Sequence, residues 1–290
     1  MALKIRSIGK LVQDTGLKIL IHGMAGSGKT VMCCTAGEPT LLISAESGLL
    51  SIKDAPKYIK GIEIENLDDL EDIYEYLYNE EEPHFKWIAL DSITEIAEQV
   101  FHAEKSISSD PRKLYPAMQD RMMEYMRKFR DLSKKGYNVV VSCKQQRISE
   151  DGGPTLYAPM MPGQKLHQQL PYLFDEVFAI RVETDENGEP YHIIQTKRDL
   201  RYEAKDRSGE LDLFEEPNLK MLAKKMRGIK TVSKKSQQQV EKLKEQLEKE
   251  DDEVEEQVET AEEPETVEEH SETAEEESVE IEDELEEEEK

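Results

Sequence analysis

The sequence predicts an α/β fold in which a mainly parallel β-sheet is flanked by helices and carries an antiparallel hairpin at its C-terminal edge. Three observations lead to this prediction. An apolar strand runs into a glycine-rich loop near the N-terminus, further apolar strands alternate with helical segments, and two strand patterns joined by a turn follow later. Glycine-rich loops between a strand and a helix bind phosphate groups, so the fold also indicates the chemistry.

Charge divides the 290 residues into two parts. Residues 241–290 hold 27 Asp and Glu against 4 Lys and Arg, a net charge of −23, which leaves −3 of the total −26 for residues 1–240. A self-repelling segment with few apolar side chains cannot offset the entropy cost of ordering. We therefore expect a folded domain at 1–230 and an acidic, largely disordered tail at 231–290, with a short helix near its start.

The phosphate loop is the most specific motif. GMAGSGKT matches the pattern G-x-x-x-x-G-K-[ST] in full, after the apolar strand LKILIHG and before KTVMCCTAG, which can begin a helix. Its glycines permit positive φ angles and direct backbone N–H groups at phosphate oxygens. We predict that Lys29 reaches the β- and γ-phosphates and that Thr30 ligates Mg²⁺. The nucleotide-binding residues are Gly23, Met24, Ala25, Gly26, Ser27, Gly28, Lys29 and Thr30.

Two further strands end near carboxylates. FKWIALD ends in Asp91, the acid expected to hold Mg²⁺ through water, and Ser92 follows it where many P-loop motors have a glutamate. TLLIS is followed by Glu46 at the edge where ligands meet an open α/β sheet. Glu46 is the candidate general base that polarises the attacking water. The alternative is an ordinary exposed loop glutamate.

A third apolar strand, YNVVVSCKQQR, ends in polar side chains. Gln145 or Gln146 at that edge is a candidate sensor of the γ-phosphate. Before it, the helical spacing of Met122, Met126 and Phe129 predicts a helix that faces the core. After it, residues 175–199 read as two strands joined at DENGEP, an antiparallel hairpin.

The cysteines and the apolar pattern exclude several classes of protein. Cys33, Cys34 and Cys143 have neither metal-ligand spacing nor a disulfide framework, so we expect structural thiols. The N-terminus lacks the apolar core of a signal peptide, and no apolar run is long enough to span a membrane. We expect a cytoplasmic protein without a membrane partner.

Taken in order, GMAGSGKT, LLISAESG, IALDS and VVVSCKQQ resemble the RecA-like P-loop ATPase core. More narrowly, QTKRDLRYEAKDRSGEL is similar to a segment of the phage RecA-like ATP-binding proteins described as single-strand annealing proteins. The resemblance covers residues 15–225 and implies a RecA-like P-loop ATPase domain at 1–230. It also implies ATP and Mg²⁺ as cofactors, a ring or filament of identical subunits, single-stranded DNA as partner and a location in the host cell cytoplasm.

The same resemblance implies roles for single residues. Glu46 matches the catalytic glutamate that follows the second core strand, and Gln145 or Gln146 matches the switch glutamine. Lys205 and Arg207 match basic residues that complete the ATP site of a neighbouring subunit. The alternative for this basic cluster is that it contacts DNA or balances nearby acids.

The resemblance also places a flexible DNA-binding loop at residues 147–169. Glu150 and Asp151 offset its cations, so an ordinary surface loop stays open as an alternative. SISSDPRKLY is a second candidate loop, or else a solvated connection between two helices. The candidate DNA-binding residues, with cations for phosphates and an aromatic ring for base stacking, are Arg112, Lys113, Arg147, Tyr157 and Lys165.

The expected activity is DNA-dependent ATP hydrolysis in phage recombination, annealing or replication. The first alternative is a helicase loader or remodelling ATPase of the AAA+ class, although an acidic pair at Asp91 and a helical lid are not evident. The second is a nucleotide-binding scaffold without significant hydrolysis; a small-molecule kinase is disfavoured because no acceptor site is evident. The acidic tail would compete with DNA, recruit a basic protein partner or only aid solubility.

Overall fold

The computed structural model of the protein describes residues 5–149, 154–163 and 165–228. Internal contacts divide the chain into two units, Met1–Val240 and Glu241–Lys290. The predicted disordered tail, the short helix at its start and the boundary between residues 230 and 231 lie outside the described residues and stay predictions.

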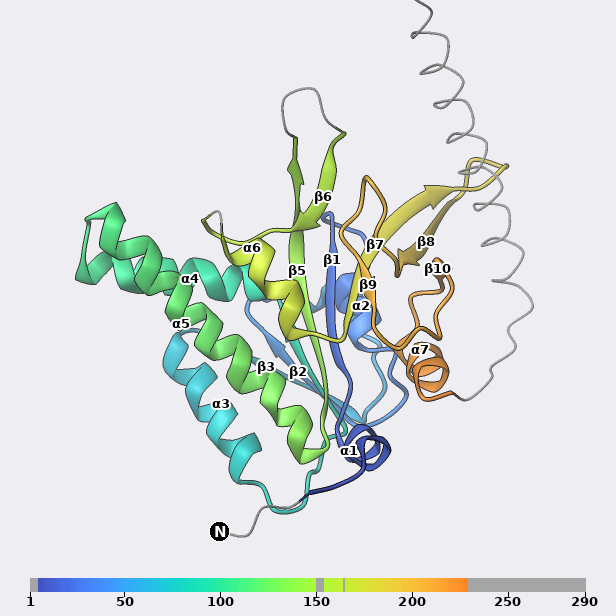
Figure 1. Ribbon diagram of the computed structural model, residues 1–290, viewed down its shortest axis with the longest axis horizontal. Helices are drawn as coiled ribbons and strands as arrows, with labels where there is room; N and C mark the ends of the chain where they lie inside the picture. The colour runs from blue at the N-terminus through green and yellow to red at the C-terminus, as the bar shows by residue number, and fades with distance from the viewer. Residues whose placement is uncertain (1–4, 150–153, 164, 229–290) are drawn as a thin grey trace, which may run out of the picture. The chain divides into compact units, whose positions relative to one another are not determined.

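The described residues contain one ten-stranded sheet, mainly parallel as the sequence predicted (Figure 1). Its order is β10-β8-β7-β1-β5-β4-β2-β3, with β6 paired to β5 and β9 paired to β7. The pairs from β7 through β1 to β3 are parallel, and the remaining pairs are antiparallel. The strands are β1 Lys18–Gly23, β2 Thr40–Ser44, β3 Ile59–Glu63, β4 Trp87–Asp91, β5 Asn138–Ile148, β6 Leu156–Pro159, β7 Glu176–Thr184, β8 Pro190–Gln195, β9 Lys205–Asp206 and β10 Phe214–Glu215.

The register of the parallel strands brings the predicted motifs to one edge of the sheet. Gly23 is opposite Lys144 on β5, and Ser44 is opposite Asp91 on β4. Because parallel strands all end at the same edge, the segments that follow β1, β2, β4 and β5 lie near one another. We call this the carboxyl edge of the sheet, and the opposite end the amino edge.

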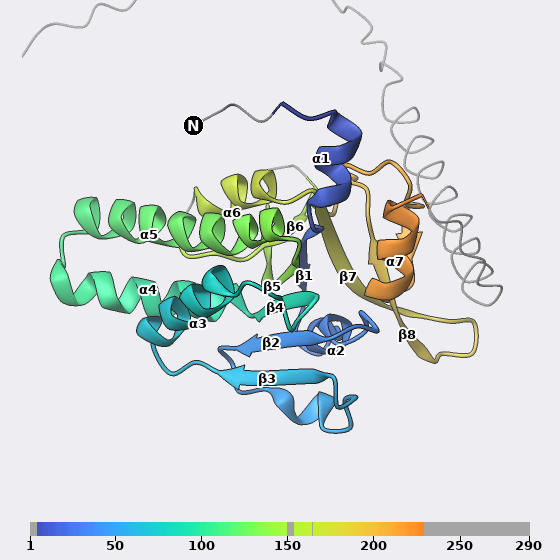
Figure 2. The ribbon, with the colours of Figure 1, turned by 90° about the horizontal axis from the view of Figure 1, so that it is seen from below.

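Helices cover both faces of the sheet, as Figures 1 and 2 show. One buried cluster joins α3, α4 and α5 to one face, and a second joins α2 and α7 to the other. The prediction for Met122, Met126 and Phe129 is confirmed, since all three are buried in the first cluster. The helices are α1 Ile8–Asp14, α2 Lys29–Cys33, α3 Leu67–Asn79, α4 Ile93–Ile107, α5 Pro111–Asp131, α6 Leu166–Gln169 and α7 Leu219–Met226, with 3-10 turns at Leu49–Ile52, Leu132–Lys135 and Leu170–Leu173.

Two hairpins extend the sheet, and one of them differs from the expectation. β7 and β8 pair from Ala179↔Gln195 to Thr184↔Pro190, which confirms the predicted antiparallel hairpin. The expected flexible loop at 147–169 is wrong for much of its described length, because β5 continues to Ile148 and β6 pairs with it. Tyr157 suits a strand, and the pairing of Leu156, Tyr157 and Ala158 with β5 satisfies backbone groups that a loop would leave to water. No helix among the described residues is long and apolar enough to cross a membrane.

Candidate functional site

The phosphate loop connects β1 to α2 and requires glycine at defined positions. Gly26 and Gly28 have φ angles of +76° and +89°, a region that other residues rarely adopt. At Gly23 a Cβ atom would lie 2.5 Å from Ser27 Oγ and 3.0 Å from the carbonyl oxygen of Ile180. The loop therefore turns tightly against β7, and its backbone is exposed to an approaching anion.

Lys29 and Thr30 begin α2 and direct their side chains to different partners. The Lys29 ammonium donates to the carbonyl oxygens of Gly23 and Met24, each at 2.9 Å. Burial lowers the pKa of Lys29, and the nearby Asp91 carboxylate partly opposes this shift. Thr30 Oγ1 donates to Asp91 Oδ2 at 2.5 Å. The loop thus carries an ammonium group and a hydroxyl group at the start of α2, as the motif predicts.

Asp91 ends β4 and is held on both carboxylate oxygens. Thr30 donates to Oδ2, and the Ser142 hydroxyl on β5 donates to Oδ1. Only 6% of Asp91 is exposed. Two hydroxyl donors fix the carboxylate beside the first turn of α2, where oxygen ligands suit a hard cation such as Mg²⁺.

Glu46 follows β2 and lies beside β4, since the two strands are neighbours. Ser92 Oγ donates to Glu46 Oε1 at 2.5 Å, and Lys144 Nζ lies 3.5 Å from the same oxygen. The Lys144 ammonium also pairs with Glu95 Oε2 on α4 at 3.2 Å. The Glu46 side chain is 36% exposed, so it is oriented by these partners and remains accessible to water.

The two candidate sensor glutamines point to other partners. Gln145 Oε1 lies 3.1 Å from Nδ1 of the buried His22, whose Nε2 lies 2.7 Å from the carbonyl oxygen of Glu203. Burial lowers the pKa of His22 to about 4, so the ring is neutral at physiological pH. Gln146 donates to the carbonyl oxygen of Pro159 on β6. A sensor role for either glutamine stays a prediction.

Three residues contact the site although the sequence analysis assigns them no role in it. Ser92 was noted only as a missing glutamate, yet it orients Glu46. Lys144 lies two positions beyond Ser142 on β5, and strand alternation could have placed it on the same face. His192 on β8 has its Nδ1 3.0 Å from the carbonyl oxygen of Ser27. No sequence signal indicates His192, because only the pairing of β8 with β7 brings it to the loop.

Lys205 and Arg207 lie at the amino edge of the sheet. Val177 is opposite Lys205 at the start of β7, whereas Ile180 of the same strand is opposite Gly23 of the phosphate loop. Lys205 Nζ donates to the carbonyl oxygens of Pro171 and Phe174 at 2.6 Å and 2.5 Å, respectively. Burial, followed by the Arg207 charge, lowers the pKa of Lys205.

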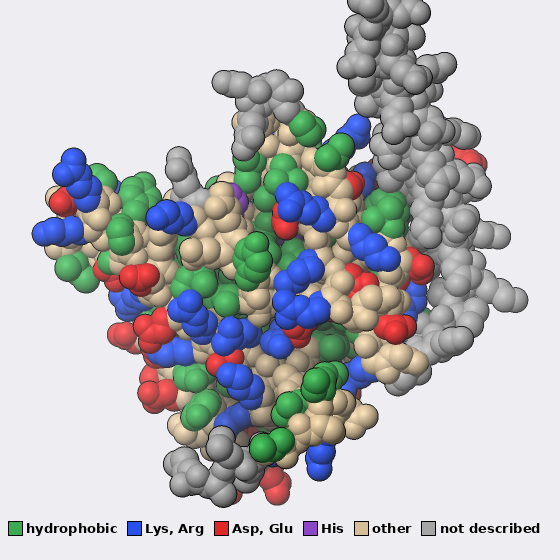
Figure 3. Space-filling model, in the orientation of Figure 1, with side chains coloured by type: hydrophobic (Ala, Val, Ile, Leu, Met, Phe, Trp, Pro, Cys, Tyr) green, Lys and Arg blue, Asp and Glu red, His purple; other side chains and the backbone are tan. Residues whose placement is uncertain are grey.

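Arg207 pairs with Asp175 at 2.6 Å, and Lys18 pairs with the same carboxylate at 2.9 Å. Figure 3 shows Lys and Arg side chains gathered over the middle of the visible face, with acidic side chains among them. The basic cluster is therefore balanced in part by local acids. Its role at the ATP site of a neighbouring subunit stays a prediction.

The candidate DNA-binding residues fall into separate groups. Arg147 lies over the Tyr157 ring at 5.5 Å, and Tyr157 stacks on Tyr202 with ring centroids 4.8 Å apart. Arg112 and Lys113 occupy the first turn of α5, at the far end of the α4–α5 pair from the β5–β6 hairpin (Figure 1). Lys165 precedes α6 and is exposed. The structure brings Arg147 and Tyr157 together and leaves Arg112 and Lys113 apart from them.

The residues at the loop fit a nucleotide with Mg²⁺. Ser27 Oγ is buried and has no hydrogen-bond partner among the described residues, as expected of a polar atom at a ligand-binding loop. The described residues contain no cluster of three His, Cys, Asp or Glu side chains, so any bound Mg²⁺ would draw its ligands from Thr30, phosphate oxygens and water.

The cysteines take no part in this site. Cys33 and Cys143 are buried and free, and burial raises the pKa of the Cys143 thiol to about 12. A thiol with such a pKa is not a nucleophile at neutral pH. Their positions agree with the structural role expected from the sequence.

Two solved structures are similar, a KaiC-like protein from Pyrococcus horikoshii OT3 and the flagellar accessory protein FlaH from Methanocaldococcus jannaschii. The first is 16% identical and the second 14%, with TM-scores of 0.38 and 0.40. Both alignments cover 62% of this chain, and they cover 78% and 77% of the other chains, respectively. A comparison with curated protein sequences gave no match.

A family model described as an AAA domain matches residues 15–208, which is more than half of the chain. This range contains the phosphate loop, Glu46, Asp91 and the basic pair Lys205 and Arg207. The chain therefore belongs to the AAA domain family and carries a nucleotide-binding P-loop ATPase domain.

Proposed function

We propose that the protein hydrolyses ATP at the phosphate loop, with Glu46 as the general base. The observation that carries this proposal is the hydrogen bond from Ser92 Oγ to Glu46 Oε1 at 2.5 Å. Ser92 follows Asp91 directly, so the candidate base is tied to the same strand end that anchors Thr30. A carboxylate held beside the phosphate loop, and still open to water, fits the role of a base.

The residues around the phosphate loop would each have a separate role in hydrolysis. Lys29 would exchange its two loop carbonyls for phosphate oxygens and stabilise their charge. Thr30 would ligate Mg²⁺ through its hydroxyl, with Asp91 behind it orienting water. Bound Mg²⁺ supplies charge neutralisation at the phosphates. Glu46 would accept a proton from the attacking water, while Ser92 and Lys144 hold its carboxylate in place.

We further propose that single-stranded DNA controls this reaction in phage recombination or annealing. Support comes from β5, which runs from Ser142 and Lys144 at the site into the β5–β6 hairpin that carries Arg147 and Tyr157. A strand that contacts both Asp91 and Glu46 can transmit a displacement of the hairpin to the base.

Assembly into a ring or filament of identical subunits is the second part of this proposal. Lys205 and Arg207 lie at the amino edge, and the phosphate loop of the same subunit lies at the carboxyl edge. Cations at the amino edge cannot reach that loop without refolding β9. If they stabilise phosphoryl charge, they do so in a neighbouring subunit.

The decisive experiment measures ATP hydrolysis with and without single-stranded DNA for the wild type, Lys29→Ala and Glu46→Gln. We expect DNA to stimulate the wild type and both substitutions to remove turnover. Equal turnover of the wild type with and without DNA would overturn the DNA proposal. Turnover of Glu46→Gln equal to that of the wild type would overturn the assignment of the base.

The AAA domain description favours one second candidate, a helicase loader or remodelling ATPase. Against it, the described residues after the β7–β8 hairpin contain a single helix of eight residues, α7, and no helical lid. A loader would respond to its helicase and not to single-stranded DNA alone. The same hydrolysis assay with DNA therefore separates the two functions.

A further inference from the structure

A cavity lined by several basic side chains lies at the amino edge of the sheet, away from the phosphate loop. It has a volume of about 300 Å³ and is formed between the start of β4, the start of β5 and one face of α7. Ala36 and Ala223 are its two apolar lining residues. Its polar lining residues are Glu38, Lys86, Asn138, Lys220, Lys224 and Arg227, which together carry four positive charges and one negative charge.

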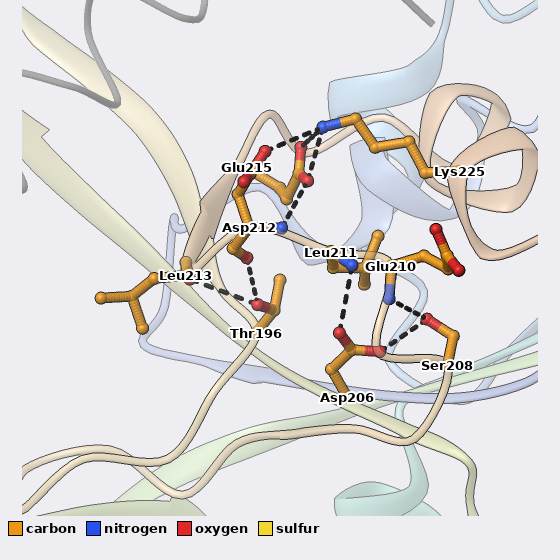
Figure 4. A network of polar contacts seen from close by, with 9 residues as sticks. All are labelled: Thr196, Asp206, Ser208, Glu210, Leu211, Asp212, Leu213, Glu215 and Lys225. Carbon is orange, nitrogen blue, oxygen red and sulfur yellow. Dashed lines mark hydrogen bonds and ion pairs between the residues drawn. The ribbon is translucent and has the colours of Figure 1, made fainter. Parts of the chain in front are cut away.

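The lysines on the two faces of α7 differ in their ion-pair partners. Lys225 is not among the lining residues, and its ammonium group pairs with Glu215 at 2.6 Å and with Asp212 at 3.3 Å. Figure 4 shows Lys225 beside these two acids. Lys220 and Lys224 line the cavity and have no ion pair within the described part of the chain. The stem of Lys220 lies against Gly37, where a Cβ atom would be 2.8 Å from its Cδ. Two ammonium groups thus lie at the cavity without an ion-pair partner among the residues that the structure describes.

Glu38 is the one acid among the described residues that line the cavity. Glu38 Oε2 accepts a hydrogen bond from Trp87 Nε1 at 3.0 Å, and its charge offsets one of the four positive charges of the lining. Lys86 Nζ donates to the carbonyl oxygen of Gly136 at 3.2 Å and has no ion pair within the described ranges. The cavity therefore keeps an excess of positive charge.

Asn138 and Arg227 complete the set of donors. Asn138 is 2% exposed, and its Oδ1 accepts from the backbone N–H of Leu17 at 3.0 Å and from Arg227 Nη2 at 3.2 Å. These bonds direct the guanidinium along the cavity wall and leave the Asn138 NH₂ group as a further donor. Ammonium, guanidinium and amide donors around one space match the several acceptor oxygens of a phosphate group.

We propose that this basic cavity binds a phosphate group of a ligand other than the nucleotide held by the phosphate loop. The register places the two sites at opposite edges of the sheet, so one small ligand cannot occupy both. The ligand is a phosphate-bearing anion, and it comes either from a free polyphosphate compound or from the backbone of a nucleic-acid strand. This site does not depend on the proposed ATP hydrolysis.

The test compares Lys220→Glu/Lys224→Glu with Lys53→Glu/Lys57→Glu, which makes the same change in net charge at two exposed lysines elsewhere. Both variants are made in the full chain carrying Lys29→Ala, so that the phosphate loop contributes little. Calorimetry then measures the binding of tripolyphosphate and of a short oligothymidylate. Lys224→Glu alone serves if the double variant fails to fold, because Lys224 does not pack on Gly37 as Lys220 does.

We expect the cavity variant to bind at least about tenfold more weakly than the control variant, because two charge-assisted hydrogen bonds to the ligand are removed. Weaker binding of both ligands would identify a general phosphate site. Weaker binding of the oligonucleotide alone would identify the ligand as the backbone of a nucleic-acid strand. In that case the slope of log Kd against log salt concentration should be smaller by about two for the cavity variant than for the control variant. Equal binding by the two variants for both ligands would overturn the proposal.

Discussion

The two edges of the sheet collect charged side chains in opposite ways. At the carboxyl edge, hydrogen bonds with hydroxyls and carbonyls hold Lys29, Asp91 and Glu46, and the Glu46 side chain is 36% exposed. At the amino edge, Glu176 is 2% exposed and Lys205 is fixed to two carbonyl oxygens. The charged groups at the carboxyl edge are placed to contact a ligand, whereas most of those around β9 are bonded to groups of the domain itself.

This difference follows from which segments build each edge. The carboxyl edge is formed by short segments directly after β1, β2, β4 and β5, so each functional residue lies within a few positions of its strand. Beside β7, the amino edge is completed by β9, which returns to pair with the start of that strand. There, the buried carboxyl of Glu176 lies beside the half-buried Asp206, and burial followed by the Asp206 charge raises the pKa of Glu176 to about 8.

Lys29→Ala should produce the largest effect and test the carboxyl edge directly. Lys29 supplies the only ammonium that contacts the loop among the described residues, so we expect ATP turnover to fall by more than about a hundredfold. Stability should change little, since the substitution removes only two exchangeable hydrogen bonds. Steady-state kinetics and thermal unfolding measure the two effects, with Lys53→Ala as the control. A turnover equal to that of the control would show that the loop is not the site.

Glu46→Gln should lower kcat by about a hundredfold or more and leave nucleotide affinity intact, because loss of a general base affects the chemical step. Glu95→Gln is the matched control. Both carboxylates pair with Lys144, but only Glu46 accepts the Ser92 hydroxyl. Rapid-mix kinetics and nucleotide titration measure the two parameters. Equal losses of kcat in the two variants would assign the effect to Lys144 and not to a base.

Glu176→Gln should change the pH dependence of stability, which tests the amino edge. The pKa of Glu176 is raised to about 8 from 4.5, so its contribution is fully present below about pH 4.5 and is lost as the pH rises through 8. The glutamine side chain does not titrate. As the pH rises through this window, the free energy of unfolding of the variant should therefore increase relative to that of the wild type, by up to a few kcal/mol. Denaturant unfolding from pH 5 to pH 9 measures the difference. Parallel curves for the two proteins would contradict the buried, protonated carboxyl.

Ser92→Ala should have the smallest effect. It removes one hydrogen bond to Glu46, so we expect kcat to fall by about tenfold, with nucleotide affinity unchanged. If Ser92 acts only through Glu46, the double variant with Glu46→Gln should be no slower than Glu46→Gln alone. Additive losses in this double-mutant cycle would give Ser92 a separate role.

Much of the fold and part of the site could be predicted from the sequence. The strands at β1, β2, β4 and β5 were readable because each is a short apolar run, and the β7–β8 hairpin because a turn separates two such runs. The expected loop at 147–169 was misread, since its glycines and prolines hide the pairing of β6 with β5. The extension of β5 past Arg147 is a tertiary effect that local composition does not indicate.

By itself, the sequence determined the phosphate loop, the carboxylates at Glu46 and Asp91, and the parallel sheet that presents them. Local rules suffice there, because a motif fixes backbone geometry within a few residues. Only the tertiary structure decided that Ser92 and Lys144 hold Glu46, that His192 contacts the loop, and that α7 turns Lys220 and Lys224 into a cavity. These contacts join segments far apart in the chain, so they depend on strand register and helix orientation, which the packing of the whole domain sets.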